Sequence, residues 1–156
     1  ATPYGGFYIL GALYRQGYVS TAEHFIRKYW SPMILKHNDT AWENFGDGSD
    51  GSGQGTLSHA WSGGPTYYLT TQVLGVELGF PIPTDTRHVT IAPQSESINW
   101  ARGTVPHPKG IIEIDWKIVG DNLFLDCNVP EGVSYDVKPR GRLAEYDLWV
   151  NGVDVD

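Results

Sequence analysis

Two pairs of residues suited to sugar chemistry lie in the segment 40–61 of this sequence. Glu43 follows Trp42, and His59 precedes Trp61 by two positions. An indole stacks on the apolar face of a pyranose ring, carboxylate and imidazole groups hydrogen-bond its hydroxyls, and a carboxylate can also activate water. These residue types therefore suggest a sugar site. Spacing alone favours the competing interpretation, in which the same aromatic residues form a hydrophobic core.

A glycine- and serine-rich loop, residues 46–55, separates the two pairs. Asp47 and Asp50 within it could bind calcium, but the order of ligands found in an EF-hand loop is absent. A flexible linker explains the composition better; it would let Glu43 and His59 converge, or it would simply be mobile. We therefore expect neither a metal nor another cofactor.

Composition excludes several functional classes. The chain has 156 residues and a net charge of −7 with no basic cluster, which argues against nucleic acid as a partner. No apolar run is long enough to span a membrane. The single cysteine, Cys127, excludes an internal disulfide and has no metal-binding spacing. One sequon begins at Asn38 and would carry a glycan if the protein is secreted from a eukaryote. A lone sequon does not decide between secretion and another compartment, so the compartment stays open.

Helix signals dominate the first half of the chain. Thr2 as N-cap, Pro3 at the first helical position and Gly17 as C-terminal cap predict a first helix. A capping box at residues 20–23 and apolar residues three and four apart predict a second helix, with a kink at Pro32. These helices must position the residues of segment 40–61.

The pattern changes after a third predicted helix, which runs from Gly64 to Gly75. Pro81 to Pro83 read as an extended linker, and apolar residues then alternate with polar ones. This alternation predicts strands within residues 112–118, 123–129, 133–137, 148–150 and 153–155. Their spacing favours a small antiparallel β-sandwich after the helices.

Three helices alone would leave wide apolar faces uncovered. We expect the faces that carry Phe7, Leu10, Phe25, Tyr29 and Trp30 to be covered by a homo-oligomer or by a partner chain. A close interface between helices and sandwich is the other solution.

An ordered series of short motifs spans nearly the whole chain. The series consists of residues 2–13, 25–30, 40–43, 57–65, 73–76, 91–93, 101–106 and 110–112. It resembles the C-terminal end of the family 78 glycoside hydrolases, the α-L-rhamnosidases. The resemblance implies an α+β chain in which residues 1–79 are the last helices of an (α/α)₆ toroid and residues 80–156 form the β-sandwich.

The same resemblance implies a partial active site. Glu43 matches the general base of this inverting family, His59 matches a histidine of the rhamnose subsite, and Trp42 and Trp61 are the implied substrate-binding neighbours. The general acid has no counterpart in this chain, although inverting hydrolysis needs two carboxyl groups. We therefore expect rhamnose or a related deoxyhexose as ligand, an upstream catalytic portion as partner, and no activity from the isolated chain.

Two other functions fit the same residues. A non-catalytic, lectin-like carbohydrate-binding protein could keep the aromatic sugar contacts without hydrolysis. A purely structural sandwich domain is the third possibility, in which Glu43 is an ordinary loop carboxylate and His59 a structural histidine.

Overall fold

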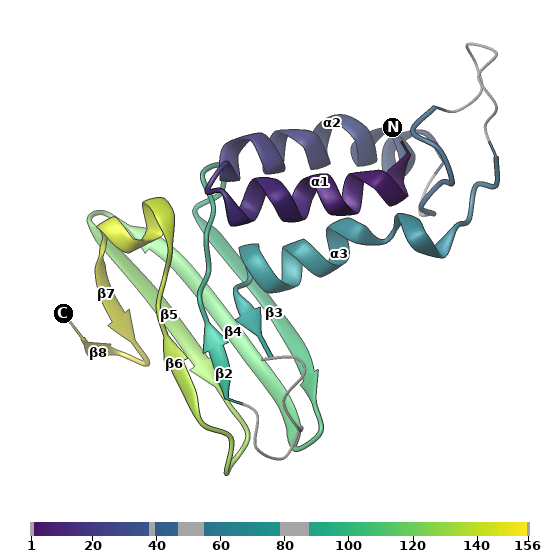
Figure 1. The fold of residues 1–156 in the computed structure, drawn as a ribbon. Helices are drawn as coiled ribbons and strands as arrows, with labels where there is room; N and C mark the ends of the chain where they lie inside the picture. The colour runs from purple at the N-terminus through teal and green to yellow at the C-terminus, as the bar shows by residue number, and fades with distance from the viewer. Residues whose placement is uncertain (1, 38–39, 47–54, 79–87, 156) are drawn as a thin grey trace. The chain divides into compact units, whose positions relative to one another are not determined.

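The computed structural model describes residues 2–37, 40–46, 55–78 and 88–155 (Figure 1). The chain divides into two compact units, Ala1–Tyr68 and Leu69–Asp156. Several predicted features lie outside the described residues: the sequon asparagine Asn38, the acidic residues Asp47 and Asp50, and the linker at 81–83. In the part of the chain that is described, no helix is both long and apolar enough to cross a membrane.

Helix α1 (Pro3–Arg15) has the predicted caps. The Thr2 hydroxyl accepts a hydrogen bond from the Gly5 N–H, and Gly17 has a φ of 76°. The N–H groups of Gly17 and Tyr18 donate to the carbonyls of Tyr14 and Leu13, which is the Schellman pattern. Local sequence therefore fixes both ends of this helix.

Helix α2 (Val19–His37) begins earlier than predicted. Its first turn closes with the Ala22 N–H donating to the Tyr18 carbonyl, so residues 20–23 lie inside the helix. The predicted capping box is therefore wrong, because Tyr18 both completes the cap of α1 and leads directly into α2. The helix continues past Pro32.

The first unit has an aromatic core of its own. Its buried residues are Leu10, Tyr14, Val19, Ala22, Trp30, Met33, Trp42 and Tyr68. Phe7, Phe25 and Tyr29 pack against this core, and the Trp30 indole donates to the Ser62 carbonyl at 2.8 Å. Leu10 and Trp30 are thus buried within the unit, whereas Phe7, Phe25 and Tyr29 are only partly buried, and their cover by a homo-oligomer or a partner chain stays a prediction.

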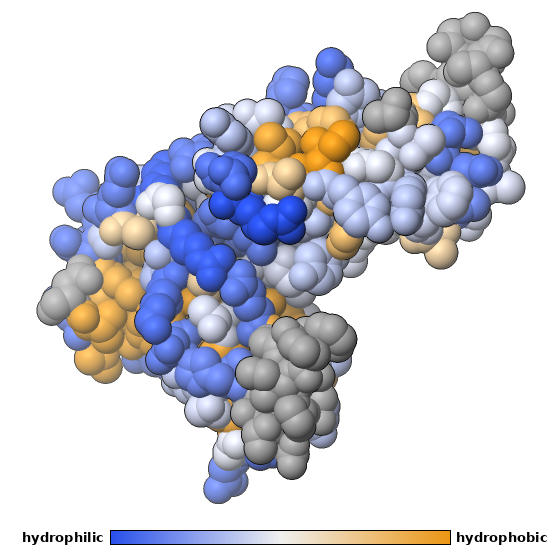
Figure 2. All heavy atoms as spheres, viewed as in Figure 1, coloured by the Kyte–Doolittle hydropathy of each residue, from blue (hydrophilic) through white to orange (hydrophobic). Residues whose placement is uncertain are grey.

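A glycine in α1 makes this packing possible. A Cβ on Gly6 would lie 2.6 Å from the Trp30 ring, so only glycine allows α1 to approach the indole this closely. Figure 2 shows apolar side chains at the surface over α1 and α2. Ile34 and Leu35 of α2 are exposed.

The third predicted helix exists, but half of it is not an α-helix. A 3₁₀ turn, η1 (Ala60–Ser62), precedes α3 (Gly64–Tyr68), and a π-helix, η2 (Leu69–Val73), follows directly. The N–H groups of Leu74 and Gly75 donate to carbonyls five residues earlier, and Gly75 then ends the segment with a φ of 90°.

The second unit contains two sheets with a 3₁₀ turn, η3 (Gly141–Glu145), between β6 and β7 (Figure 1). The smaller sheet orders its strands as β1 (Val76–Glu77), β2 (Val89–Ile91) and β6 (Tyr135–Val137). The larger sheet orders them as β3 (Trp100–His107), β4 (Gly110–Val119), β5 (Asn122–Asn128), β7 (Asp147–Val150) and β8 (Val153–Asp154). Pairing is antiparallel except between β2 and β6 and between β5 and β7, which are parallel.

Both sheets contribute to one core, at whose centre Trp116 is fully buried. Its indole N–H donates to the Val73 carbonyl at 3.0 Å, which attaches the π-helix to the larger sheet. The predicted α+β class, helices followed by a small β-sandwich, is confirmed, and most of the strand pairs are antiparallel as predicted. The two parallel pairs were not predicted. They arise because the chain leaves the larger sheet after β5 and forms β6 in the smaller sheet. It then returns to the larger sheet as β7, beside β5.

Candidate functional site

Two backbone hydrogen bonds hold the ends of the glycine-rich loop together. The Glu43 N–H donates to the Thr56 carbonyl at 2.9 Å, and the His59 N–H donates to the Ala41 carbonyl at 2.8 Å. These bonds place segment 41–43 beside segment 56–59, although the loop separates them in sequence. Glu43 and His59 therefore lie on neighbouring stretches of backbone.

Thr56 joins the two side chains. Glu43 Oε2 accepts from the Thr56 N–H at 2.9 Å and from its hydroxyl at 3.3 Å. The same hydroxyl is 3.0 Å from His59 Nδ1, which itself lies 3.8 Å from Glu43 Oε2. Both side chains stay about 30% exposed, at 31% for Glu43 and 28% for His59. The result is an accessible carboxylate and imidazole with a shared positioning residue that sequence reasoning did not identify.

These contacts set the charge of the carboxylate. The Thr56 N–H lowers the pKa of Glu43, and the nearby His59 and the Thr56 hydroxyl lower it further. The group is consequently ionised at neutral pH. An ionised carboxylate can accept a proton from water or a hydrogen bond from a sugar hydroxyl, whereas a general acid must be protonated.

We expect Glu43 to titrate below the ordinary glutamate value of about 4.3. Because the pKa of Glu43 is lower in the folded state, its ionised form stabilises the fold at pH values above the unfolded-state pKa. This contribution to the free energy of unfolding is lost as the pH falls through the folded-state pKa. Thr56→Val removes the hydroxyl and keeps the N–H, so the pKa should rise only in part. Carbon-detected NMR titration of the Glu43 carboxyl measures this pKa in the unaltered chain and in Thr56→Val. A Glu43 carboxyl in the unaltered chain whose pKa is not below the ordinary glutamate value would contradict this network.

Gly55 allows the carboxylate to lie against the backbone. Its φ is 64°, and a Cβ there would lie 2.6 Å from Glu43 Oε2 and 2.9 Å from Asn44 Nδ2. An alanine would thus be strained and would push the carboxylate aside. Gly17, with a φ of 76° and nothing near its Cβ position, offers a matched control that carries only the backbone strain.

The two tryptophans of the segment have different surroundings. Trp61 is 45% exposed, and its ring centroid lies 4.1 Å from that of His59. Trp42 is 1% exposed, and its carbonyl accepts a hydrogen bond from the Ser62 hydroxyl. Trp42 therefore anchors the segment in the core and has no open face for a sugar, so a stacking contact can come only from Trp61 of this pair.

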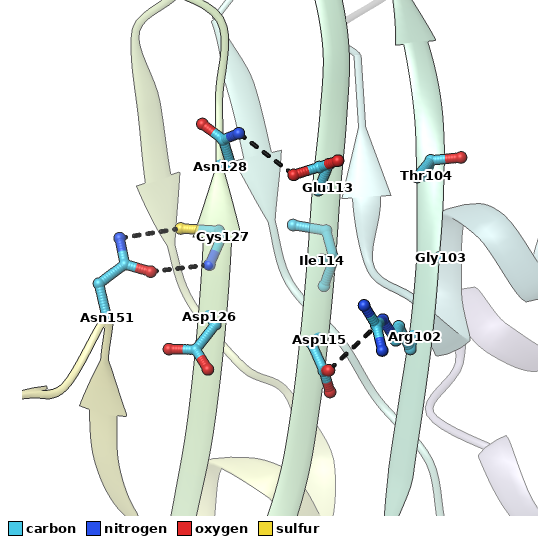
Figure 3. Close-up of a pocket in the computed structure, with 10 residues that line it drawn as sticks. All are labelled: Arg102, Gly103, Thr104, Glu113, Ile114, Asp115, Asp126, Cys127, Asn128 and Asn151. Carbon is cyan, nitrogen blue, oxygen red and sulfur yellow. Dashed lines mark hydrogen bonds and ion pairs between the residues drawn. The ribbon is translucent and has the colours of Figure 1, made fainter.

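A concavity lies on the outer face of the larger sheet, apart from Glu43 and His59 in sequence (Figure 3). It encloses about 460 Å³ and is lined by acidic, amide and arginine side chains of β3, β4 and β5 and by Asn151. Arg102 pairs with Asp115 at 3.6 Å, and Asn128 donates to Glu113 at 3.2 Å. Among the described residues, no three potential ligands are grouped to hold a metal ion. Glu113 and Asp115 face outward, as expected from the alternation.

Comparison with known proteins identifies relatives of this fold. Residues 75–144 match the family described as the bacterial alpha-L-rhamnosidase C-terminal domain. An alpha-L-rhamnosidase of Alteromonas sp. (strain LOR) is 26% identical over 116 residues, which cover 70% of this chain and 12% of that protein. The chain thus spans about one eighth of that relative's length.

Two solved structures share the fold. The GH78 family rhamnosidase of Bacillus sp. GL1 superposes with a TM-score of 0.68 and 28% identity, over 88% of this chain and 16% of that one. The alpha-L-rhamnosidase from Dictyoglumus thermophilum superposes with a TM-score of 0.69 and 18% identity, over 85% of this chain and 15% of that one, which supports the fold alone. As its ordered motifs predict, the chain resembles the C-terminal part of the family 78 glycoside hydrolases, the α-L-rhamnosidases.

Proposed function

We propose that this chain is the C-terminal part of an enzyme that hydrolyses terminal α-L-rhamnosides with inversion, and that Glu43 is the general base. The observation that carries the proposal is the position of the Glu43 carboxylate, which Thr56 holds beside His59 and an exposed indole. The rhamnosidase relatives support the substrate class. They are also much longer than this chain, which supports an upstream portion. An upstream portion would complete the helical toroid and supply the general acid.

Each residue then has a distinct task. Glu43 takes a proton from a water molecule, whose oxygen forms a bond to the anomeric carbon as the glycosidic C–O bond breaks. The electron pair of that bond goes to the leaving oxygen, which the acid of the upstream portion protonates. Thr56 holds the carboxylate, His59 hydrogen-bonds sugar hydroxyls, and Trp61 stacks on the ring.

The isolated chain should release no measurable product from an aryl α-L-rhamnoside. A general acid contributes typically about 10²–10⁴-fold to the rate, and most of the sugar subsite would be missing with it. A coupled or chromogenic assay on a homogeneous preparation measures this. Steady turnover that co-purifies with the chain and disappears in Glu43→Gln would show that the chain supplies its own acid, contrary to the proposal.

A further inference from the structure

The strand register of the larger sheet sets side chains in rows across its outer face. Trp100 of β3 pairs with Lys117 of β4, Lys117 with Phe124 of β5, and Phe124 with Trp149 of β7. Directly paired residues point to the same face of a sheet, and successive residues along a strand point to opposite faces. Because Trp116, which precedes Lys117, is fully buried, this row lies on the outer face. We call Trp100, Phe124 and Trp149 the ring row.

A row of polar residues runs beside the ring row. Two positions along the strands, Arg102 pairs with Asp115, and Asp115 pairs with Asp126. The two rows are about 6.5 Å apart, which is the rise of two residues in a strand. Figure 3 shows the three polar side chains at one level on neighbouring strands, where they line the concavity of the outer face. We call Arg102, Asp115 and Asp126 the polar row.

The end of β7 leaves the polar row open. β7 pairs only with the first four residues of β5, and the Cys127 N–H then donates to Asn151 Oδ1 at 2.8 Å. Among the described residues, no hydrogen bond or ion pair involves the Asp126 carboxylate. The side chains of Arg102 and Asp115, which pair at 3.6 Å, are 77% and 47% exposed. The polar row therefore offers both donors and acceptors to a ligand.

The rings of the ring row are accessible as well. Trp100, on the edge strand β3, is 66% exposed. Phe124 and Trp149 are half-buried with ring centroids 5.9 Å apart, and the Trp149 indole donates to Asn122 Oδ1 at 2.9 Å. Cross-strand packing accounts for the pair of Phe124 and Trp149. It does not account for the exposed indole of Trp100 in the same row.

The charge of the polar row distinguishes the kinds of partner that this face suits. A protein domain that covered it would take two carboxylates and one guanidinium out of water, and charged residues are depleted at the centres of protein interfaces. A sugar can replace that water, because its hydroxyls donate to carboxylates while its apolar face stacks on an indole. The excess negative charge of the row disfavours an anionic sugar. The face therefore suits a neutral sugar.

We propose that the outer face of the larger sheet binds a neutral oligosaccharide, in a site separate from Glu43. The indoles of Trp100 and Trp149 stack on its sugar rings. Asp126 accepts hydrogen bonds from its hydroxyls, and Arg102 donates to them. The two indoles lie three strand spacings apart, about 14 Å, so a single sugar ring is too short to contact both. The site does not depend on the proposed function, and its role is to hold the protein on a glycan chain.

NMR titration of the isotope-labelled chain tests this site with defined probes. The probes are the neutral tetrasaccharides cellotetraose, mannotetraose and xylotetraose, each compared with its monosaccharide. We expect at least one tetrasaccharide to shift the indole signals of both Trp100 and Trp149 with saturation. It should bind about two- to tenfold more tightly than its monosaccharide, the range for one additional aromatic contact.

Variants assign the contacts. Trp100→Leu should lower the affinity for the tetrasaccharide to that for the monosaccharide. Asp126→Asn should weaken both ligands by about three- to tenfold, because a charge-assisted hydrogen bond is lost. Asp121→Asn, the same change in the exposed turn before β5, is the matched control and should change neither affinity. Circular dichroism verifies that each variant is folded.

Several results would overturn the proposal. They are the absence of any shift at the two indoles with every tetrasaccharide up to tens of millimolar, and binding that survives both Trp100→Leu and Asp126→Asn. Shifts of the polar row by tetralysine without a response to sugars would assign the face to a cationic partner instead. In a complete rhamnosidase that carries this chain, Trp100→Leu should weaken tetrasaccharide binding by the same factor, and no change there would mean that another part covers the face.

The site on the sheet and the site at Glu43 fail separately. A chain whose Trp61 and Thr56 signals ignore L-rhamnose, but whose Trp100 and Trp149 signals respond to a tetrasaccharide, would lack the site at Glu43 and keep the one on the sheet. Tetrasaccharide shifts confined to Trp61 and Thr56 would remove the site on the sheet alone.

Discussion

Replacing Glu43 by Gln in a complete rhamnosidase that carries this segment is expected to lower kcat by about 10²–10⁴-fold, with a much smaller change in KM. The amide keeps the size and hydrogen-bonding oxygen of the carboxylate but cannot take a proton from water. Since a general base acts in the transition state, its loss should appear in kcat rather than in substrate binding. A suitable protein is a chimera in which this chain replaces the corresponding segment of the Bacillus sp. GL1 enzyme, which aligns with 88% of it.

A matched control tests whether the effect belongs to Glu43. Glu113→Gln makes the same chemical change on the outer face of the larger sheet, and it should leave kcat within about twofold of the unaltered chimera. Should Glu43→Gln in an active, folded chimera retain the full kcat, Glu43 would not be the base.

Gly75→Ala is expected to destabilise the second unit by about 3 kcal/mol or more. The φ of 90° at Gly75 lies in the left-handed region, which costs a residue with a Cβ roughly 1–2 kcal/mol. The new Cβ would lie 2.2 Å from the Pro93 nitrogen, so backbone would have to move, and such overpacking costs typically a further 1–3 kcal/mol. The Gly75 carbonyl also accepts from the Ala92 N–H at 2.7 Å, so the shift would disturb the pairing of β1 with β2.

Gly120→Ala separates these two costs. Gly120 has a φ of 60° and nothing within 4 Å of its Cβ position, so only the conformational cost of about 1–2 kcal/mol remains. Urea unfolding of both variants, monitored by tryptophan fluorescence, gives the free energies of unfolding. Equal losses in the two variants would mean that Gly75 and Pro93 do not approach this closely.

Sequence predicted the elements whose determinants are local. Thr2 and Gly17 specify the ends of α1 through hydrogen bonds within a few residues. The β4–β5 hairpin follows from strict alternation on both sides of a turn at Gly120 and Asp121. The convergence of Glu43 and His59 was one of two outcomes expected from the sequence, because the glycines and serines between them permit it without requiring it.

Features that depend on distant contacts were not predictable. Trp42 is buried because α2 and Ser62 enclose it, and nothing in its neighbouring sequence distinguishes it from the exposed Trp61. Thr56 gains its role only when the two loop ends pair, and no spacing rule marks it. The π-helix likewise reflects tertiary structure, since its Val73 carbonyl accepts from the indole of Trp116 in a later strand.

The central claim is that Glu43, Thr56, His59 and Trp61 form part of a rhamnose site. Titration of the isotope-labelled chain with L-rhamnose, monitored by the indole signal of Trp61 and the amide signal of Thr56, tests it most directly. One stacked indole and a few hydrogen bonds to a well-hydrated ligand predict a millimolar Kd, about −4 kcal/mol.

The variants at two glycines make the titration decisive. Gly55→Ala should displace the Glu43 carboxylate and weaken binding, while Gly17→Ala, with the same backbone strain and no clash, should bind rhamnose as the unaltered chain does. The account predicts saturable shifts at Trp61 and Thr56 that require a higher rhamnose concentration in Gly55→Ala. Signals that stay unmoved up to tens of millimolar rhamnose, or that move only at the outer face of the larger sheet, would contradict it.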